Sequence, residues 1–275
     1  MLYSFPSVAE EAFKPLRFEG RALLRAAFVS RKAASATLFF VPVFLLAWVA
    51  PARGQDAGGF GGVQSIGIAT SYSPDSSHML IGDSEQRRLW SAGIEYTHLL
   101  HQRSGFRLDY EGSVQPFYLE SDPTLTGTYF SYGGHTFVTP QTPVRVVTLE
   151  RGPVGSLPLG SGSSLPFYAL YGRQNTYAAV LAPLGARVGA LPRRRVQPSF
   201  AIHLGLVFSA RDIPVDDADQ FNFMFEFGPG VQVYTGARSA LRLEYLYHHV
   251  SNAHLGNLNP GVDQGVFRLT FSRYR

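Results

Sequence analysis

The 275-residue sequence contains no cysteine, which excludes a disulfide framework and a thiolate metal site. It also has no lysine after Lys32, so every later cation is an arginine. After Ala52 no apolar run is long enough for a membrane-spanning helix, and no helical period competes with the alternation described below. Such a chain has to be stabilised by the hydrogen bonding and packing of its fold alone.

Residues 1–54 have the composition of a secretory signal peptide. A basic region up to Lys32 precedes an uncharged apolar run, Ala33–Ala52, and small residues follow. This order is typical of an export signal, which would be cleaved before Gln55. The alternative is an uncleaved membrane anchor, because the run is nearly long enough to span. Pro42 and the glycine-rich stretch after the run favour cleavage.

The positive charge of the chain belongs mainly to this leader. Residues 1–54 hold 7 of the 24 Lys and Arg residues but only 3 of the 20 Asp and Glu residues. The rest therefore carries 17 basic and 17 acidic side chains, with a net charge of zero. The sequence pI of about 9.4 thus gives no indication of nucleic acid binding.

From residue 64 onward, apolar and polar residues alternate with a period of two. In 220–228, for example, phenylalanine recurs at every second position opposite Asn222 and Glu226. A soluble sandwich also alternates, but Phe- and Leu-rich faces opposite Arg, Asp and Glu are more typical of a transmembrane barrel. There the apolar face contacts lipid and the polar face fills the lumen. The pattern predicts an all-β fold, an antiparallel outer-membrane β-barrel.

We predict eight antiparallel strands, at about 64–73, 87–100, 105–119, 176–190, 197–211, 220–235, 238–251 and 262–274. An even number brings both termini to the periplasmic side, and the connections alternate between short turns and mostly longer loops, as expected. Residues 55–275 would form one barrel domain with an insertion at about 120–175. That segment is rich in Gly, Pro, Ser and Thr, and is either a long extracellular loop or a hidden hairpin with a strand near Thr142–Leu149.

The residues that could carry chemistry lie at the end of the seventh predicted strand and the start of the eighth. His249 and Ser251 are two residues apart, so on a strand their side chains share one face. A serine hydroxyl needs an adjacent base, and a carboxylate can orient and support the imidazole that supplies it. Asp263 follows the intervening loop as a candidate acid.

Alternation also predicts the faces of these residues. His249 and Ser251 share a face with Leu243, and Asp263 shares one with Phe267, so all three should lie on the lipid-facing side beside an extracellular loop. His248 points the other way, into the lumen, where a structural hydrogen bond is expected.

The segment His249-Val250-Ser251-Asn252-Ala253, with Asn259-Pro260-Gly261, resembles the signature of the lipid A 3-O-deacylases (PagL type, or acyloxyacyl hydrolases). Shorter pieces also resemble this family, namely Ala182-Pro183-Leu184-Gly185, Phe221-Asn222-Phe223 and Gly228-Pro229-Gly230. The likeness covers about residues 180–275. It implies an eight-stranded outer-membrane barrel that hydrolyses an ester-linked acyl chain of lipid A, at the 3-O position.

The resemblance also implies roles for individual residues. Ser251 would be the nucleophile and His249 the base, while Asn252 and Asn259 would help to form the oxyanion hole. The family commonly has a glutamate fourteen residues after the histidine, and Asp263 occupies that position here. Its shorter side chain has to come closer to the imidazole.

Lipid A or lipopolysaccharide would be the substrate, with the outer membrane as the location, and the resemblance further suggests a homodimer. Ester hydrolysis by such a set needs no cofactor and no metal. Two other functions fit the same alternation. A non-catalytic small barrel, either a pore or a structural or adhesion protein, needs no histidine–serine–acid set. An outer-membrane acyltransferase would keep that set but pass the acyl group to an acceptor other than water.

Overall fold

The computed structural model describes residues 60–160 and 162–275, so the expected signal peptide lies outside the described residues. The described part of the chain is all-β. Its ten strands are β1 (Gln64–Ser73), β2 (Arg88–Gln102), β3 (Phe106–Tyr132), β4 (His135–Arg145), β5 (Pro153–Gly160), β6 (Ser163–Ala190), β7 (Val196–Ile213), β8 (Asp219–Gly236), β9 (Ser239–Ser251) and β10 (Val262–Tyr274). Within these ranges no helix is long and apolar enough to cross a membrane.

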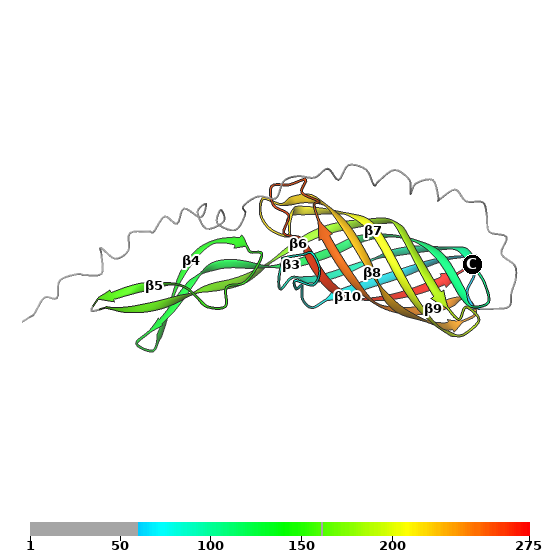
Figure 1. Cartoon of the computed structure of the whole chain (residues 1–275), viewed down its shortest axis with the longest axis horizontal. Helices are drawn as coiled ribbons and strands as arrows, with labels where there is room; N and C mark the ends of the chain where they lie inside the picture. Colours follow the sequence, from blue (N-terminus) through cyan, green and yellow to red (C-terminus); the bar gives the residue numbers. More distant parts are fainter. Residues whose placement is uncertain (1–59, 161) are drawn as a thin grey trace, which may run out of the picture. The chain divides into compact units, whose positions relative to one another are not determined.

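Eight of the described strands close into an antiparallel ring (Figure 1). Their order is β1, β2, β3, β6, β7, β8, β9 and β10, with β10 pairing back to β1 and β3 pairing directly with β6. Closure leaves no unpaired edge among the ring strands, which is what a β-structure in lipid requires. The predicted fold class is confirmed.

The remaining strands, β4 and β5, are additional to the eight that the sequence predicts. β3 pairs with β2 as far as Ser121 and with β4 from Thr124 onward, so it continues past the ring. β6 is extended in the same way and pairs with β5. The segment 120–175 thus consists largely of strands. Of the strand suggested near Thr142–Leu149 only residues 142–145 are in a strand, as the end of β4.

Side chains alternate across the ring as the sequence predicts. On β9 and β10 the apolar Leu243 and Phe267 are 56% and 52% exposed, whereas the neighbouring Arg242 and Arg268 are 1% and 4% exposed. Exposed apolar side chains therefore lie on the outer face of the ring, while most ionisable ones face the lumen, together with an apolar cluster that includes Leu89, Val207 and Met224. This distribution matches a membrane barrel and is the reverse of that in a soluble protein.

The two ends of the ring differ as predicted. The short turns lie at one end together with the C-terminus, since Gly61 N donates to Ala237 O and Leu191 N donates to Gly105 O. At the other end the long connections contact one another, for example through Leu258 N and Asp217 O. In bacterial barrels the short turns are periplasmic and the long loops extracellular.

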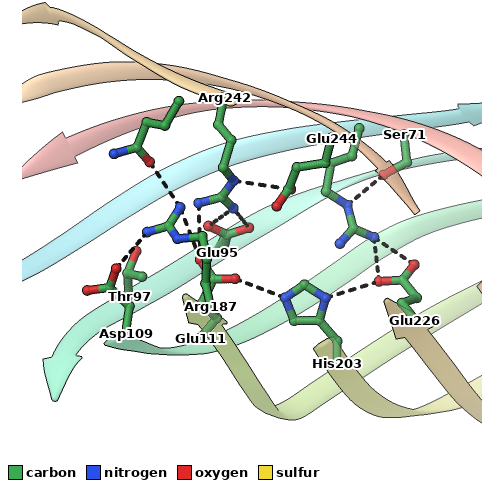
Figure 2. Close-up of polar contacts among 12 residues, drawn as sticks. Ser71, Glu95, Thr97, Asp109, Glu111, Arg187, His203, Glu226, Arg242 and Glu244 are labelled. Atoms are coloured by element: carbon green, nitrogen blue, oxygen red, sulfur yellow. Dashed lines mark hydrogen bonds and ion pairs between the residues drawn. The ribbon is translucent and has the colours of Figure 1, made fainter. Parts of the chain in front are cut away.

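A network of buried ion pairs fills part of the lumen (Figure 2). Arg242 bonds Glu95 and Glu111, and its Nε lies 3.1 Å from the Glu244 carboxylate. His203 contacts Glu111 through Nε2 and Glu226 through Nδ1. Four arginines and two histidines are linked in this way to five carboxylates; they are Arg107, Arg187, Arg242, Arg268, His203, His248, Glu95, Asp109, Glu111, Glu226 and Glu244.

Because these charges are buried, removing one partner leaves the others uncompensated. We expect Arg242→Leu to lower the free energy of unfolding by about 3–5 kcal/mol. The measurement is unfolding by urea in detergent micelles. Arg273→Gln, which alters an exposed arginine at the short-turn end, is the control and should change stability by less than about 0.5 kcal/mol. Equal stability of the two variants would contradict the role given to the network.

Candidate active site

The register of β9 and β10 places His249 and Asp263 directly opposite each other. Side chains of directly opposite residues lie on the same face of an antiparallel pair, with Cβ atoms about 4.5–5.5 Å apart. His249 Nδ1 and Asp263 Oδ1 are 2.7 Å apart. Since an ionised carboxylate can only accept hydrogen bonds, Nδ1 carries a proton and donates a hydrogen bond to Asp263. In the neutral imidazole the other ring nitrogen, Nε2, then carries no proton and can act as a base.

Asp263 is held by three further donors. The hydroxyl of Tyr247 donates to the same carboxylate oxygen that His249 uses, at 2.7 Å. The backbone N–H groups of Leu80 and Ile81 donate to the other oxygen, at 2.7 and 2.9 Å. The Asp263 side chain is fully buried, with 0% exposure. Burial disfavours the charged carboxylate, but the four donors favour it and fix its orientation.

The covering amides belong to the loop 74–87 between β1 and β2. Ser76 bridges Gln264 of β10, and Ser77 N donates to the backbone oxygen of Asp263. The loop thus follows the start of β10 and folds over its outer face. The sequence predicts that the site lies on the lipid-facing side. In the structure Asp263 shares the face of Phe267, which is exposed. The loop, however, shields the acid from direct lipid contact.

Ser251 is the last residue of β9 and is partly buried. It shares the face of His249 and pairs with Phe223 of the neighbouring β8. In the described ranges no hydrogen bond joins the Ser251 hydroxyl to the His249 imidazole. Such contacts are often loose in the absence of substrate and tighten when it binds.

The predicted oxyanion residues lie in the loop that follows β9. Asn259 Oδ1 accepts from the backbone N–H of Asn252 at 3.0 Å. The side-chain amide of Asn252 donates to Leu258 O and its oxygen accepts from His254 N, at 2.8 and 2.9 Å. Both asparagines therefore hold the loop's conformation next to Ser251. One of the two N–H donors of the Asn252 amide is used by Leu258.

Gly261 brings this loop back against the imidazole. It has a positive φ of 63°, which favours glycine. A Cβ at this position would lie 3.0 Å from His249 Cε1. Gly82 of the loop 74–87 has a similar role on the other side of the acid, because a Cβ there would lie 2.8 Å from Asp263 Oδ1. The backbone at two glycines, Gly82 and Gly261, thus lies close to the His249–Asp263 pair.

The sequence reasoning did not find Tyr247, Leu80 or Ile81 as part of this site. Tyr247 could have been found, because it lies two residues before His249 on the same face. The contribution of the loop 74–87 has no sequence signal, because it is made by backbone amides, which every residue but proline has.

The fold and the site together define a class of protein: an outer-membrane β-barrel with a histidine–carboxylate pair on its outer face. Residues 161–272 match the family model of the lipid A 3-O-deacylases (PagL), so the resemblance predicted from the sequence is confirmed over this part of the chain. No curated protein sequence matches the chain.

Several solved structures of outer-membrane proteins are similar to the chain. The outer membrane enzyme PagL is 12% identical, with 76% of this chain and 99% of that one covered and a TM-score of 0.42. Neisserial surface protein A is 10% identical, with 78% and 99% covered and a TM-score of 0.41. OprG from Pseudomonas aeruginosa is 10% identical, with 78% and 97% covered and a TM-score of 0.37.

The close approach at Gly261 can be tested by substitution. Gly261→Ala should destabilise the fold more than Gly133→Ala does, as measured by urea-induced unfolding. Both glycines have positive φ and pay the backbone cost of about 1–2 kcal/mol, but a Cβ at Gly133 meets nothing within 4 Å. Equal losses for the two variants would show that His249 is not packed against Gly261.

Proposed function

We propose that the protein is a serine esterase of the outer membrane that removes an ester-linked acyl chain from lipid A. The observation that carries the proposal is the hydrogen-bonded pair of His249 and Asp263, with Ser251 on the same face of the barrel. This face is turned toward the lipid, where the acyl chains of the substrate are. The match of residues 161–272 to the lipid A 3-O-deacylases supports the substrate class.

The proposed reaction uses the hydrogen bond from His249 Nδ1 to Asp263, which leaves Nε2 of the imidazole as the base. His249 Nε2 takes the proton of the Ser251 hydroxyl as its oxygen attacks the ester carbonyl, and Asp263 stabilises the resulting imidazolium. The tetrahedral intermediate collapses to an acyl-enzyme as the sugar oxygen leaves with the proton from Nε2. Water then attacks the acyl-enzyme with the same base, releases the fatty acid and regenerates the Ser251 hydroxyl.

The negative oxygen of the tetrahedral intermediate needs hydrogen-bond donors. In our proposal the second N–H of the Asn252 side-chain amide supplies one of them. Asn259 acts indirectly, by holding the backbone of Asn252 in place. Removing one such donor typically costs about a hundredfold to a thousandfold in turnover.

The outer face also offers a place for the cleaved acyl chain. A groove of about 510 Å³ is lined mainly by apolar side chains of β1, β2, β9 and β10. These include Tyr72, Trp90, Leu243, Phe267 and Leu269. Phe267 is four residues from Asp263 on β10, or roughly 13 Å at about 3.3 Å per residue. We propose that an acyl chain leaving Ser251 follows this groove along the barrel.

The packing of the lumen argues against the alternative function of a pore. The ion pairs around Arg242 and Arg187 cross the lumen, and the cavity between Arg107, Arg187 and Gln232 measures only about 10 Å³. That volume holds about one water molecule. The 3-O position of cleavage and the homodimer, both suggested by the family resemblance, remain predictions.

The nucleophile can be tested by mass spectrometry of lipid A from cells that produce the protein. Wild type should remove one acyl chain, and Ser251→Ala should reduce turnover by at least about a thousandfold while leaving an intact, heat-resistant barrel. Ser131→Ala, which alters an exposed hydrogen bond on β3, is the control and should behave as wild type. Gain of an acyl chain would instead indicate a transferase, and full activity of Ser251→Ala would exclude the mechanism.

The acid is tested by the pair Asp263→Asn and Asp263→Glu. The amide would favour the wrong tautomer of His249, so Asp263→Asn should lower kcat by about four orders of magnitude. Asp263→Glu keeps the charge, but a longer side chain has to shift the contacts that Asp263 makes with Leu80, Ile81 and the close-lying Gly82. We therefore expect a loss smaller than that of Asp263→Asn. Wild-type activity of Asp263→Asn would remove Asp263 from the mechanism.

A further inference from the structure

The loop 74–87 combines a contact to the acid with an exposed apolar tip. The backbone amides of Leu80 and Ile81 bind Asp263, while their side chains are 62% and 64% exposed. The preceding Met79 is 42% exposed. Exposing three consecutive apolar side chains of a loop tip to water is unfavourable, because their surface is not buried against other apolar groups. Within the described residues they have no apolar partner of the protein's own core.

The base of this loop is fixed. Ser76 O accepts from Gln86 N, and the Ser76 hydroxyl receives Arg87 N and donates to Ser84 O. The buried Arg87 side chain binds the backbone oxygens of Val146 and Pro214. The tip is bound to Asp263 through the amides of Leu80 and Ile81. On either side of it His78 Nδ1 donates to Gly82 O, Ser77 N donates to Asp263 O and Asp83 N donates to Pro260 O. These contacts set the position of the loop, and the side chains of the tip are left exposed to the surroundings.

Those surroundings follow from the side of the barrel on which the tip lies. The amides of Leu80 and Ile81 approach Asp263 from outside, so their side chains project away from the barrel wall. The same wall exposes Tyr72, Trp90 and Phe267 to lipid, at 48%, 57% and 52% exposure. Tyr72 and Trp90 lie on the strands that the loop joins. The apolar tip thus lies on the same outer side of the barrel as the lipid-facing surface of the ring.

We propose that the tip Met79–Ile81 inserts into the acyl layer of the outer leaflet, and that this contact holds the two amides against Asp263. The acid would then be fully oriented only in a lipid environment. Leu80 and Ile81 act here as positioning residues through their backbone. The part of the proposal that concerns turnover rests on the proposed function, whereas the part that concerns lipid contact does not.

Lipid contact is measured by fluorescence quenching with the full chain in vesicles of brominated phosphatidylcholine. Trp90 in the unaltered chain is the lipid-facing reference. The Trp90→Phe chain, which keeps only Trp48, gives the baseline that is subtracted from every measurement. Leu80→Trp in that chain should be quenched as strongly as the Trp90 reference. Val138→Trp is the control, because Val138 is 53% exposed on β4, which pairs with β3 only beyond the ring. Quenching of Leu80→Trp no stronger than that of Val138→Trp would overturn the proposal, whatever the enzyme activity.

The positioning role is measured with Leu80→Gln combined with Ile81→Gln, which removes the apolar side chains and keeps both N–H donors. Deacylation of lipid A in vesicles should show a kcat lowered by about tenfold to a hundredfold with little change in KM, since a misplaced catalytic group costs about that much. Val138→Gln is the control and should keep the wild-type kcat. A higher KM with unchanged kcat would mean that the tip only binds substrate, and would overturn the positioning role. Activity in wild type and its loss in Ser251→Ala show separately whether the proposed function holds.

Discussion

The pairing register of β9 with β10 is the constraint on which the site depends. It sets His249 opposite Asp263, and a slip of one residue would turn one of them to the other face of the barrel. The register is fixed from both sides. Along both strands the apolar side chains have to face lipid and the charged ones have to face the lumen. At the end of the pair, the hydrogen bond from Asn252 N to Asn259 Oδ1 closes the connecting loop. The site thus uses a geometry that membrane insertion already imposes.

The same alternation assigns different tasks to neighbouring residues. His248 and His249 are consecutive, yet His248 is bonded to Glu226 and Tyr118 in the lumen while His249 is bonded to Asp263 outside. Ion pairs in the lumen cross-link the strands from within, because each buried charge is costly unless it is paired. The rigid wall that results is a suitable base for an external site, since catalytic groups have to be held to a fraction of an ångström.

The sequence allowed prediction of the ring strands, because lipid on one side and packed charge on the other enforce a period of two. It did not locate β4 or the extensions of β3 and β6, because these strands lie beyond the ring, where lipid and packed charge no longer select opposite faces. β4 is exposed along almost its whole length, so neither face is selected for apolar residues. Its Gly-, Pro- and Thr-rich surroundings are typical of a loop, and strand pairing with the extended β3 decides the structure there.

For the candidate site, the placement of the side chains on one face was predictable and the backbone contacts were not. His249, Ser251 and Asp263 could be grouped because their spacing and faces can be read from the sequence. The amides of Leu80 and Ile81 could not, since their position depends on how a distant loop folds against β10. This difference also explains how an aspartate can occupy a position where glutamate is usual in the resembled family. A short carboxylate contacts only what lies close to its own strand. The register supplies the imidazole at that distance, and the loop brings the remaining donors to it.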